Sequence, residues 1–309
     1  MTSFLNALPG AVSQGLIWGI MAIGLYITYR ILDLADLTVD GSFCTGGVVC
    51  VMMIVNGWSV WTAMLCAFLA GCLTGLVTGF FHTQCGIPAI LSGILTQLGL
   101  WSVNLATMGM KANTALNVNN YKLLVSLRYL QEVNKGTRPF YNHPIFVVGV
   151  VTVLVIAVLY WFFGTERGAS IRATGANEHM ARAQGINTNA NVVLGLMLSN
   201  GLVALSGGLL AQFQGAADVG MGRGAIVIGL AAVIISEVTF GKIFRNFGLK
   251  MFAVALGAVI YYFVLQIVLQ LGLNTNDLKL ISALIVAIFL SVPYWKDKLI
   301  HKKGGMRHA

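Results

Sequence analysis

The sequence predicts an all-α integral membrane protein with about nine transmembrane helices, each long enough to cross a bilayer core. Of its 309 residues, 57% are hydrophobic and 9% are charged, whereas ordinary globular domains carry roughly 25% charged residues. The mean hydropathy is +0.82, and the apolar residues fall into long runs. This composition excludes a nucleic-acid-binding protein, despite the net charge of +9, and argues against a soluble enzyme.

Nine apolar segments are candidate spans, and totals of eight or ten remain open. In chain order they are 11–29, 36–55, 58–81, 87–109, 144–163, 191–214, 224–240, 250–271 and 277–294. The second and the seventh give the weakest signal, because each is Gly-rich and polar at one end. In the third span, small residues recur every four positions at Ala67, Gly71, Gly75 and Gly79. Such a stripe favours close helix packing within the chain, with a dimer contact as the alternative.

The distribution of Lys and Arg predicts an outside N-terminus and a cytoplasmic C-terminus. Alternating nine spans on this basis places 12 of the 19 basic residues inside and 7 outside. Five of the outside residues lie in one long Asn-rich loop, 110–143, and long loops translocate their charges more readily than short ones. The apolar middle of that loop, 121–130, is expected to pack on the membrane surface, and the basic tail 295–309 is expected to anchor the inside.

Two stretches suggest an inverted repeat. Residues 35–42 and 217–224 both read Ala-Asp-apolar and continue through a Gly-rich kink into an apolar run, 182 positions apart. They fall at opposite faces in this topology, as in transporters built from two inverted halves; chance similarity remains the alternative. The chain is then one domain, 1–309: a first half (11–109), a connector span (144–163), a cytoplasmic loop (164–190), a second half (191–294) and the tail.

The sequence contains few groups for chemistry. Its cysteines form no CxxC pair and lack a His at metal-ligand spacing, so they are interpreted as core residues and no metal or cofactor is expected: Cys44, Cys50, Cys66, Cys72 and Cys85. The phosphate-loop pattern GxxxxGK[ST] is absent, so a partner or an ion gradient must supply energy. The carboxylates of Asp33, Asp36, Asp40 and Asp218 are placed at membrane edges, where helix starts favour them. With no ionisable group expected at mid-span, the pattern argues against ion coupling.

Neutral polar side chains inside the spans must face the bundle interior, because lipid leaves them unsatisfied. Interhelical hydrogen bonding and a polar translocation path both remain open for them. The candidate path residues are Thr96, Gln97, Asn104, Ser199, Asn200, Gln212 and Gln214.

The cytoplasmic loop contains a short helix signal over 177–185. Asn177 is a good N-cap, Glu178 complements the positive helix end, and Gly185 is a typical helix-ending residue. A helix of this length is unstable alone in water, so the bundle or a partner must hold it.

Three stretches carry a family resemblance: RATGANEHMARAQGI (172–186), DLADLTVDGSF (33–43) and the Gly-rich run 205–230. The first resembles the cytoplasmic coupling segment of the branched-chain amino-acid and ribose type permeases of ABC importers, and the chain is most similar to the subgroup of aromatic amino-acid (tryptophan/tyrosine) import permeases.

The resemblance implies a type II ABC importer-like permease fold in the bacterial inner membrane. It also implies partners: a second copy of the chain, two cytoplasmic ATPase subunits that carry ATP and Mg²⁺, and an extracytoplasmic substrate-binding (lipo)protein that docks near 110–143. The residues implied to couple the chain to the ATPase are Thr174, Gly175, Asn177, Glu178, His179, Met180, Ala181, Arg182 and Gly185.

On this resemblance the chain is a permease subunit without an ATPase site of its own, and its substrate is a small polar solute, favoured to be an amino acid. Nucleosides or sugars remain alternatives for the substrate. An ion-coupled secondary transporter is the first alternative class, and a channel or membrane enzyme is the second. The last is disfavoured because the five His residues are scattered along the chain.

Overall fold

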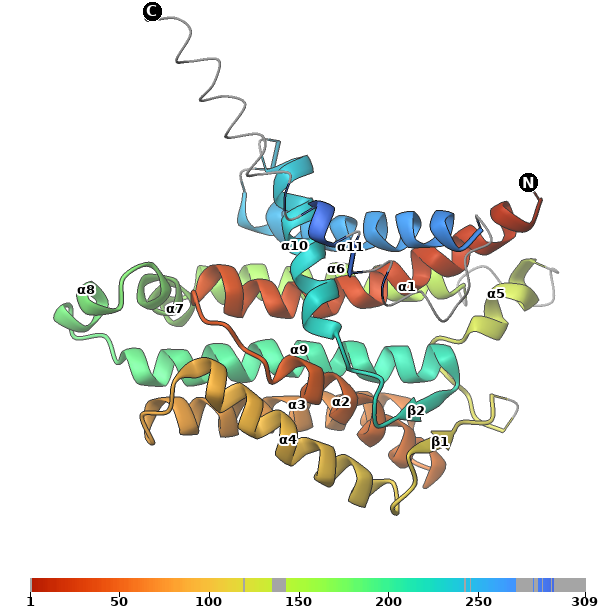
Figure 1. Ribbon diagram of the computed structural model, residues 1–309, viewed down its shortest axis with the longest axis horizontal. Coiled ribbons are helices and arrows are strands. Elements are labelled where there is room, and N and C mark those ends of the chain that lie inside the picture. Colours follow the sequence, from red (N-terminus) through yellow and green to blue (C-terminus); the bar gives the residue numbers. More distant parts are fainter. Residues whose placement is uncertain are drawn as a thin grey trace, which may run out of the picture.

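The protein is a bundle of long, roughly aligned helices (Figure 1). The computed structural model describes residues 2–118, 120–134, 143–241, 243–244 and 246–270, with isolated positions between 280 and 291. The main helices are α1 (Thr2–Tyr26), continued by the π-helical segment η1 (Ile27–Ile31), α2 (Val39–Val55), α3 (Val60–Thr83), α4 (Ala89–Thr107), α6 (Pro144–Gly164), α9 (Thr188–Gln214), α10 (Ala225–Phe240) and α11 (Phe247–Gln270). The smaller elements are β1 (Asn113–Ala115), α5 (Leu127–Asn134), α7 (Glu166–Ala176), α8 (Glu178–Ala183) and β2 (Ala216–Asp218).

Helices occupy the first eight predicted spans, and their ends agree to within a few residues except that α1 begins at Thr2, nine residues before the predicted start. Among the described residues, six helices are long and apolar enough to cross a bilayer, while α2 and α10 are shorter apolar helices. These two are the segments that gave the weakest sequence signal. The predicted ninth span, 277–294, and the tail, 295–309, lie largely or wholly outside the described residues.

The bundle has two distinct ends (Figure 1). Helices α7 and α8 lie at one end, which we call the α8 end. The two-stranded antiparallel sheet β1–β2 and α5 lie at the other, which we call the sheet end. The middle of the long loop packs onto the sheet end, where Leu123 and Val125 are buried and the Leu124 amide donates to Gln212 Oε1 at 3.1 Å.

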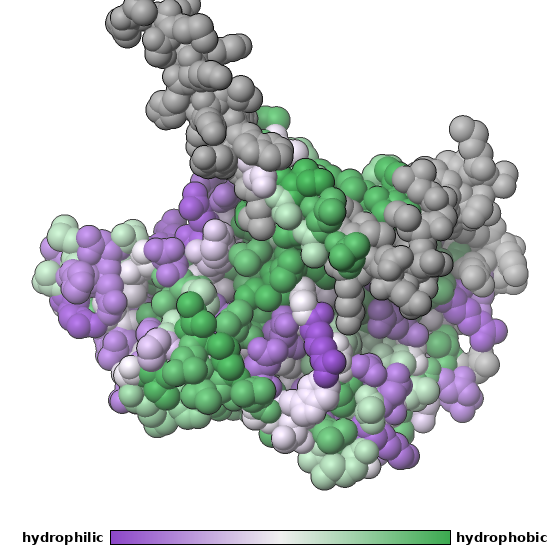
Figure 2. All heavy atoms as spheres, viewed as in Figure 1, coloured by the Kyte–Doolittle hydropathy of each residue, from purple (hydrophilic) through white to green (hydrophobic). Residues whose placement is uncertain are grey.

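Helix α9 forms the centre of the bundle, and the small-residue stripe of α3 packs against it. A Cβ added at Gly71 or Gly75 would collide with the carbonyl oxygens of Asn200 or Leu196, and Gly79 faces Val193. The stripe therefore brings two backbones into contact within one chain, which confirms the intramolecular interpretation. Figure 2 shows that much of the outer surface of the bundle is hydrophobic, as expected of a face turned to lipid.

The two shorter helices are related by inversion. After α1 the chain turns back through 32–38, and α2 then runs to the sheet end, where Tyr121 Oη donates to the carbonyl of Val55. After α9 the chain turns back through β2 and 219–224, and α10 runs to the α8 end, where Glu237 pairs with Arg30 at 3.0 Å. The N-termini of α2 and α10 meet: both oxygens of Asp40 accept hydrogen bonds from α10, from the amides of Gly224 and Ile226 at 3.0 Å.

The meeting of the two short helices corrects one sequence-based placement. Asp36 and Asp40 were expected at a membrane edge, but they lie in the middle of the bundle. Asp36 Oδ2 accepts from Asn200, which is near the midpoint of α9. The sequence-based prediction was wrong for these two residues because the segment 32–38 runs back into the bundle before α2 begins.

Candidate functional site

The predicted helix of the loop 164–190 is present as α8. Asn177 Oδ1 accepts from the amide of Met180 at 3.0 Å and caps the helix, as predicted. Gly185 has a φ of +78°, the left-handed conformation typical of a helix-ending glycine. A second helix, α7, precedes it and was not predicted. Thr165 followed by Glu166 is an N-cap signal that could have revealed α7, since Thr165 Oγ1 accepts from the amide of Gly168.

Helix α7 is fixed to the bundle by buried contacts. The side-chain amide of Asn191, on α9, donates to Ser170 Oγ at 2.6 Å and to Thr174 Oγ1 at 2.9 Å. A Cβ at Gly175 would overlap the carbonyl oxygen of Ile31 in η1. Of the predicted coupling residues, Thr174 and Gly175 therefore face inward and support the segment rather than forming its outer surface.

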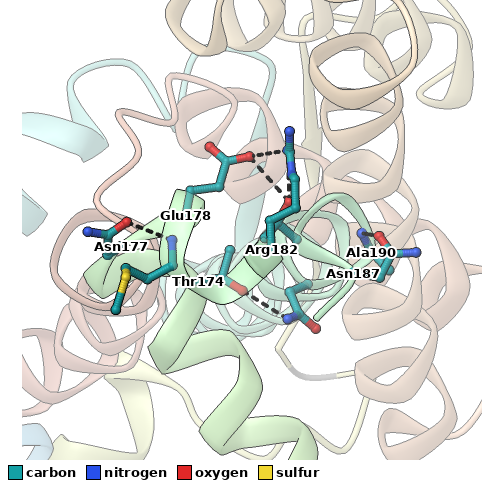
Figure 3. Close-up of polar contacts among 9 residues, drawn as sticks. Thr174, Asn177, Glu178, Arg182, Asn187 and Ala190 are labelled. Atoms are coloured by element: carbon teal, nitrogen blue, oxygen red, sulfur yellow. Dashed lines mark hydrogen bonds and ion pairs between the residues drawn. The ribbon is translucent and has the colours of Figure 1, made fainter. Parts of the chain in front are cut away.

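The outer face of α8 is polar and exposed, and Figure 3 shows the Glu178 carboxylate and the Arg182 guanidinium turned toward each other. Glu178 and Arg182 form an ion pair of 2.6 Å, and Arg182 also donates to Thr188 Oγ1 at 3.0 Å. His179 is exposed beside them and Met180 is 63% exposed, whereas Ala181 is buried against the bundle. The structure thus presents one anchored, short helix with a charged and thioether-bearing surface at the α8 end.

A buried polar cluster lies where α2, α3, α4 and α9 meet. Asn200 donates to Asp36 Oδ2 at 2.7 Å and accepts from Ser42 Oγ at 2.6 Å, and Ser42 contacts Thr74 Oγ1 at 2.7 Å. A second row of hydroxyls continues the cluster, with Thr38–Thr78 at 2.7 Å and Thr78–Thr96 at 3.0 Å. All of these side chains are buried.

A pocket of about 360 Å³ adjoins this cluster at the break before α10. Its polar lining comes from Asp40 on α2, Gln97 and Asn104 on α4, and Arg223. The guanidinium of Arg223 lies 4.5 Å from the centre of the Trp101 ring. Arg223 directly precedes the predicted span 224–240, and the distribution of Lys and Arg placed it outside, but it lies beside the N-terminus of α2 because α10 starts halfway along the bundle.

The candidate path residues therefore separate into groups. Thr96 and Asn200 belong to the buried cluster, and Gln97 and Asn104 line the pocket. Ser199 donates to the carbonyl of Gly24 at 2.7 Å and joins α9 to α1. Gln212 is buried against Cys50 and Met64, and Gln214 is exposed where α9 ends.

Sequence reasoning missed Asp36, Ser42, Asp40 and Arg223 as members of these interior sites. The available signal was the pair of matched stretches 35–42 and 217–224, which contain all four residues, the first three in 35–42 and Arg223 in 217–224. Their similarity does not reveal that the two stretches touch each other.

Comparison with known proteins gives consistent matches over nearly the whole chain. A family model described as Branched-chain amino acid transport system / permease component matches residues 8–292. The chain is 38% identical over 288 residues to the Tyrosine transport system permease protein of Clostridioides difficile (strain R20291), covering 93% of this chain and 91% of that protein. It is 32% identical over 289 residues to the Uncharacterized protein RP368 of Rickettsia prowazekii (strain Madrid E), covering 93% and 98%. Among solved structures, PsaBC from Streptococcus pneumoniae in complex with Fab matches with a TM-score of 0.51 at 13% identity, over 92% of this chain and 90% of that chain, which shows a shared fold.

Proposed function

The chain belongs to the family of branched-chain amino acid transport system permease components, which are ABC-transporter permeases, and from this premise we propose that it forms the membrane path of an ATP-driven amino-acid importer. The family membership confirms the resemblance carried by 33–43, 172–186 and 205–230. The proposed complex contains a second copy of the chain, two ATPase subunits that hold ATP and Mg²⁺, and an extracytoplasmic binding (lipo)protein.

The observation that carries the coupling role is the exposed helix α8 on a buried support. Because Asn191, Ser170 and Thr174 fix α7 from within, a force applied to α8 reaches η1 and α9 instead of being absorbed by a loose loop. The charged face of Glu178 and Arg182 offers a surface to an ATPase subunit without disturbing the bundle. His179, Met180 and Gly185 complete that surface.

The amino-acid assignment rests on similarity to a tyrosine transport permease, and nucleosides or sugars are the alternative substrates.

Ion-coupled transport gains one argument from the structure, since Asp36 lies in the middle of the bundle. However, Asp36 is 2% exposed, and its two oxygens accept hydrogen bonds, one from Thr38 and the other from Asn200.

Uptake by proteoliposomes containing the complete transporter tests the proposal. Uptake should require ATP on the side of the membrane where the ATPase subunits lie, and it should persist when proton and sodium gradients are collapsed. Gradient-driven uptake without ATP would overturn it.

Reversing the charges of α8 should uncouple the chain from its ATPase. Glu178→Arg or Arg182→Glu should weaken ATPase co-purification by roughly 100-fold, because like charges at an interface cost several kcal/mol. The bundle should stay folded, since an exposed i,i+4 pair contributes only about 0.3–0.5 kcal/mol.

The double variant Glu178→Arg/Arg182→Glu separates docking from local structure, because it restores the ion pair with its polarity reversed. It should remain defective. A double variant with normal ATPase binding would show that only the internal pair matters. The matched control is the Arg128–Glu132 pair of α5, at the sheet end and 3.0 Å apart; swapping it should leave ATPase co-purification unchanged.

We propose that the α8 end is cytoplasmic and the sheet end is outside, as the distribution of Lys and Arg predicts. The exposed Cys85, between α3 and α4, is a native probe of the α8 end, and Asn56 is an exposed position at the sheet end. A variant retaining only Cys85 should react with an impermeant maleimide only in inside-out vesicles. Asn56→Cys, in a background lacking all five cysteines, should react in intact cells. Reaction of both from one side would contradict the topology.

A further inference from the structure

The pocket before α10 contains opposite charges in the middle of a membrane protein. Asp40 enters it from α2 and Arg223 from the turn that precedes α10. Charged side chains at this depth are costly in lipid, and they face a bundle interior or a water-filled cavity, where they usually serve a pathway. Figure 2 shows a hydrophilic patch near the start of α10, bordered above and to the left by hydrophobic surface. These groups are therefore positioned for a polar ligand rather than for lipid.

The two charged groups retain capacity for a ligand. No ion pair joins Arg223 to a carboxylate among the described residues, and the guanidinium stacks over Trp101 instead, 4.5 Å from the ring centre. A guanidinium stacked in this way still presents donors that suit a carboxylate. Asp40 accepts backbone hydrogen bonds from Gly224 and Ile226, and the amide of Ala225 also interacts with its carboxylate. A carboxylate has about four acceptor sites in all, so one remains. It can accept an ammonium donor as well.

The remaining lining supplies an apolar wall and neutral hydrogen-bonding groups. Trp101, Leu98 and Val219 are apolar, while Gln97 and Asn104 present amides from α4. The volume of about 360 Å³ lies at the lower end of the range of roughly 300–1,000 Å³ that small-molecule sites occupy. A single amino acid matches this scale better than a peptide does.

We propose that this pocket is a transient binding site for a zwitterionic α-amino acid on its way through the permease. Arg223 binds the α-carboxylate, Asp40 accepts from the α-ammonium group, and the side chain of the ligand lies along Trp101. A neutral nucleoside or sugar would leave both charges unmatched, so the pocket selects for molecules that carry both. This inference rests on the proposed importer function and names the substrate class of its path.

The test uses the assembled permease–ATPase complex in nanodiscs without the binding protein, so that the pocket is measured alone. The probes are radiolabelled L-tyrosine, and unlabelled tyramine and 4-hydroxyphenylpropionate, which lack the carboxylate and the ammonium group respectively. L-tyrosine should bind saturably, and both analogues should compete at least about 10-fold less well, because each loses a charge-assisted hydrogen bond.

Arg223→Gln should weaken L-tyrosine binding about 10- to 100-fold and should abolish the preference for L-tyrosine over tyramine, while Arg223→Lys should retain part of it. Asp40→Asn should abolish the preference over 4-hydroxyphenylpropionate. The control Arg167→Gln removes an exposed arginine on α7, away from the pocket, and should bind as the wild type does.

Absence of saturable binding to the wild-type complex, equal competition by the analogues, or unchanged binding in Arg223→Gln would overturn the proposed site. Uptake assays separate this result from failure of the importer function. If the wild-type transporter with its binding protein imports L-tyrosine with ATP, and Arg223→Gln and Asp40→Asn import it equally well, the function stands and the site is wrong. If the wild type shows no ATP-driven uptake, the function itself fails.

Discussion

Replacing Gly46 by alanine should prevent the bundle from reaching its native packing. Gly46 lies where α2 crosses α9, and a Cβ there would overlap the carbonyl group of Ala204. Gly207 of α9 makes the reciprocal contact with the carbonyl of Phe43. Because the obstructing atoms are backbone, no rotamer change relieves the collision, and α2 must shift. Overpacking of well-packed cores costs about 1–3 kcal/mol, and we expect at least the upper end of that range, with most of the protein lost from the monodisperse fraction in detergent.

Gly99→Ala is the matched control, because a Cβ at Gly99 on α4 meets nothing within 4 Å. It should leave the melting temperature and the size-exclusion profile unchanged or slightly improved. Gly207→Ala should resemble Gly46→Ala. A Gly46→Ala variant that melts like Gly99→Ala would show that the close crossing of α2 and α9 is not required for folding.

Replacing Asn200 by leucine should be the second severe change. It removes the amide that donates to Asp36 at 2.7 Å and the oxygen that accepts from Ser42 at 2.6 Å. The Asp36 carboxylate, 2% exposed, would then keep only Thr38 as a partner, through its backbone amide and its hydroxyl. Leaving a buried acceptor unsatisfied costs about 1–3 kcal/mol, and more when the acceptor is charged, which should appear as a large fall in thermal stability in detergent.

The double variant Asp36→Leu/Asn200→Leu tests whether the penalty comes from the stranded carboxylate. Replacement of both partners by apolar groups is often close to neutral, so the double variant should recover much of the lost stability. Its transport activity should be measured separately from its melting curve. If the double variant is less stable than Asn200→Leu, the cluster contributes more through its hydrogen bonds than the buried charge costs.

The helices could be predicted because lipid imposes one strong rule, that each crossing needs a long apolar run with its backbone groups satisfied internally. The small-residue stripe of α3 was readable for a related reason, since only small residues permit backbone contact at Gly71 and Gly75. The N-cap at Asn177 and the turn at Gly185 were readable because capping is a local interaction between neighbouring residues.

The interior sites could not be predicted because they depend on contacts between distant parts of the chain. Asp40 reaches Ile226 across 186 positions and Ser42 reaches Asn200 across 158. Sequence hydropathy assigned 36–55 to one span, which placed Asp36 at an edge, whereas an Asx turn onto Thr38 delays the helix until Val39. Similarly, Gln212 and Gln97 have the same side chain, but Gln212 holds the loop at Leu124 whereas Gln97 lines the pocket. Only their tertiary surroundings distinguish these two roles.

The capping of α10 by Asp40 has a consequence for how the chain is made. With 16 residues, α10 is about 24 Å long, which falls short of the roughly 30 Å of hydrocarbon that an independently inserted helix must cross. Two of its first amides, those of Gly224 and Ile226, donate to a carboxylate synthesised some 180 residues earlier. During synthesis, α10 therefore has no stable membrane position until α2 is already in place. The first half of the chain acts as the template on which the second half completes its insertion, so we expect biogenesis to be sequential and the late-folding segment to be the one most dependent on insertion machinery.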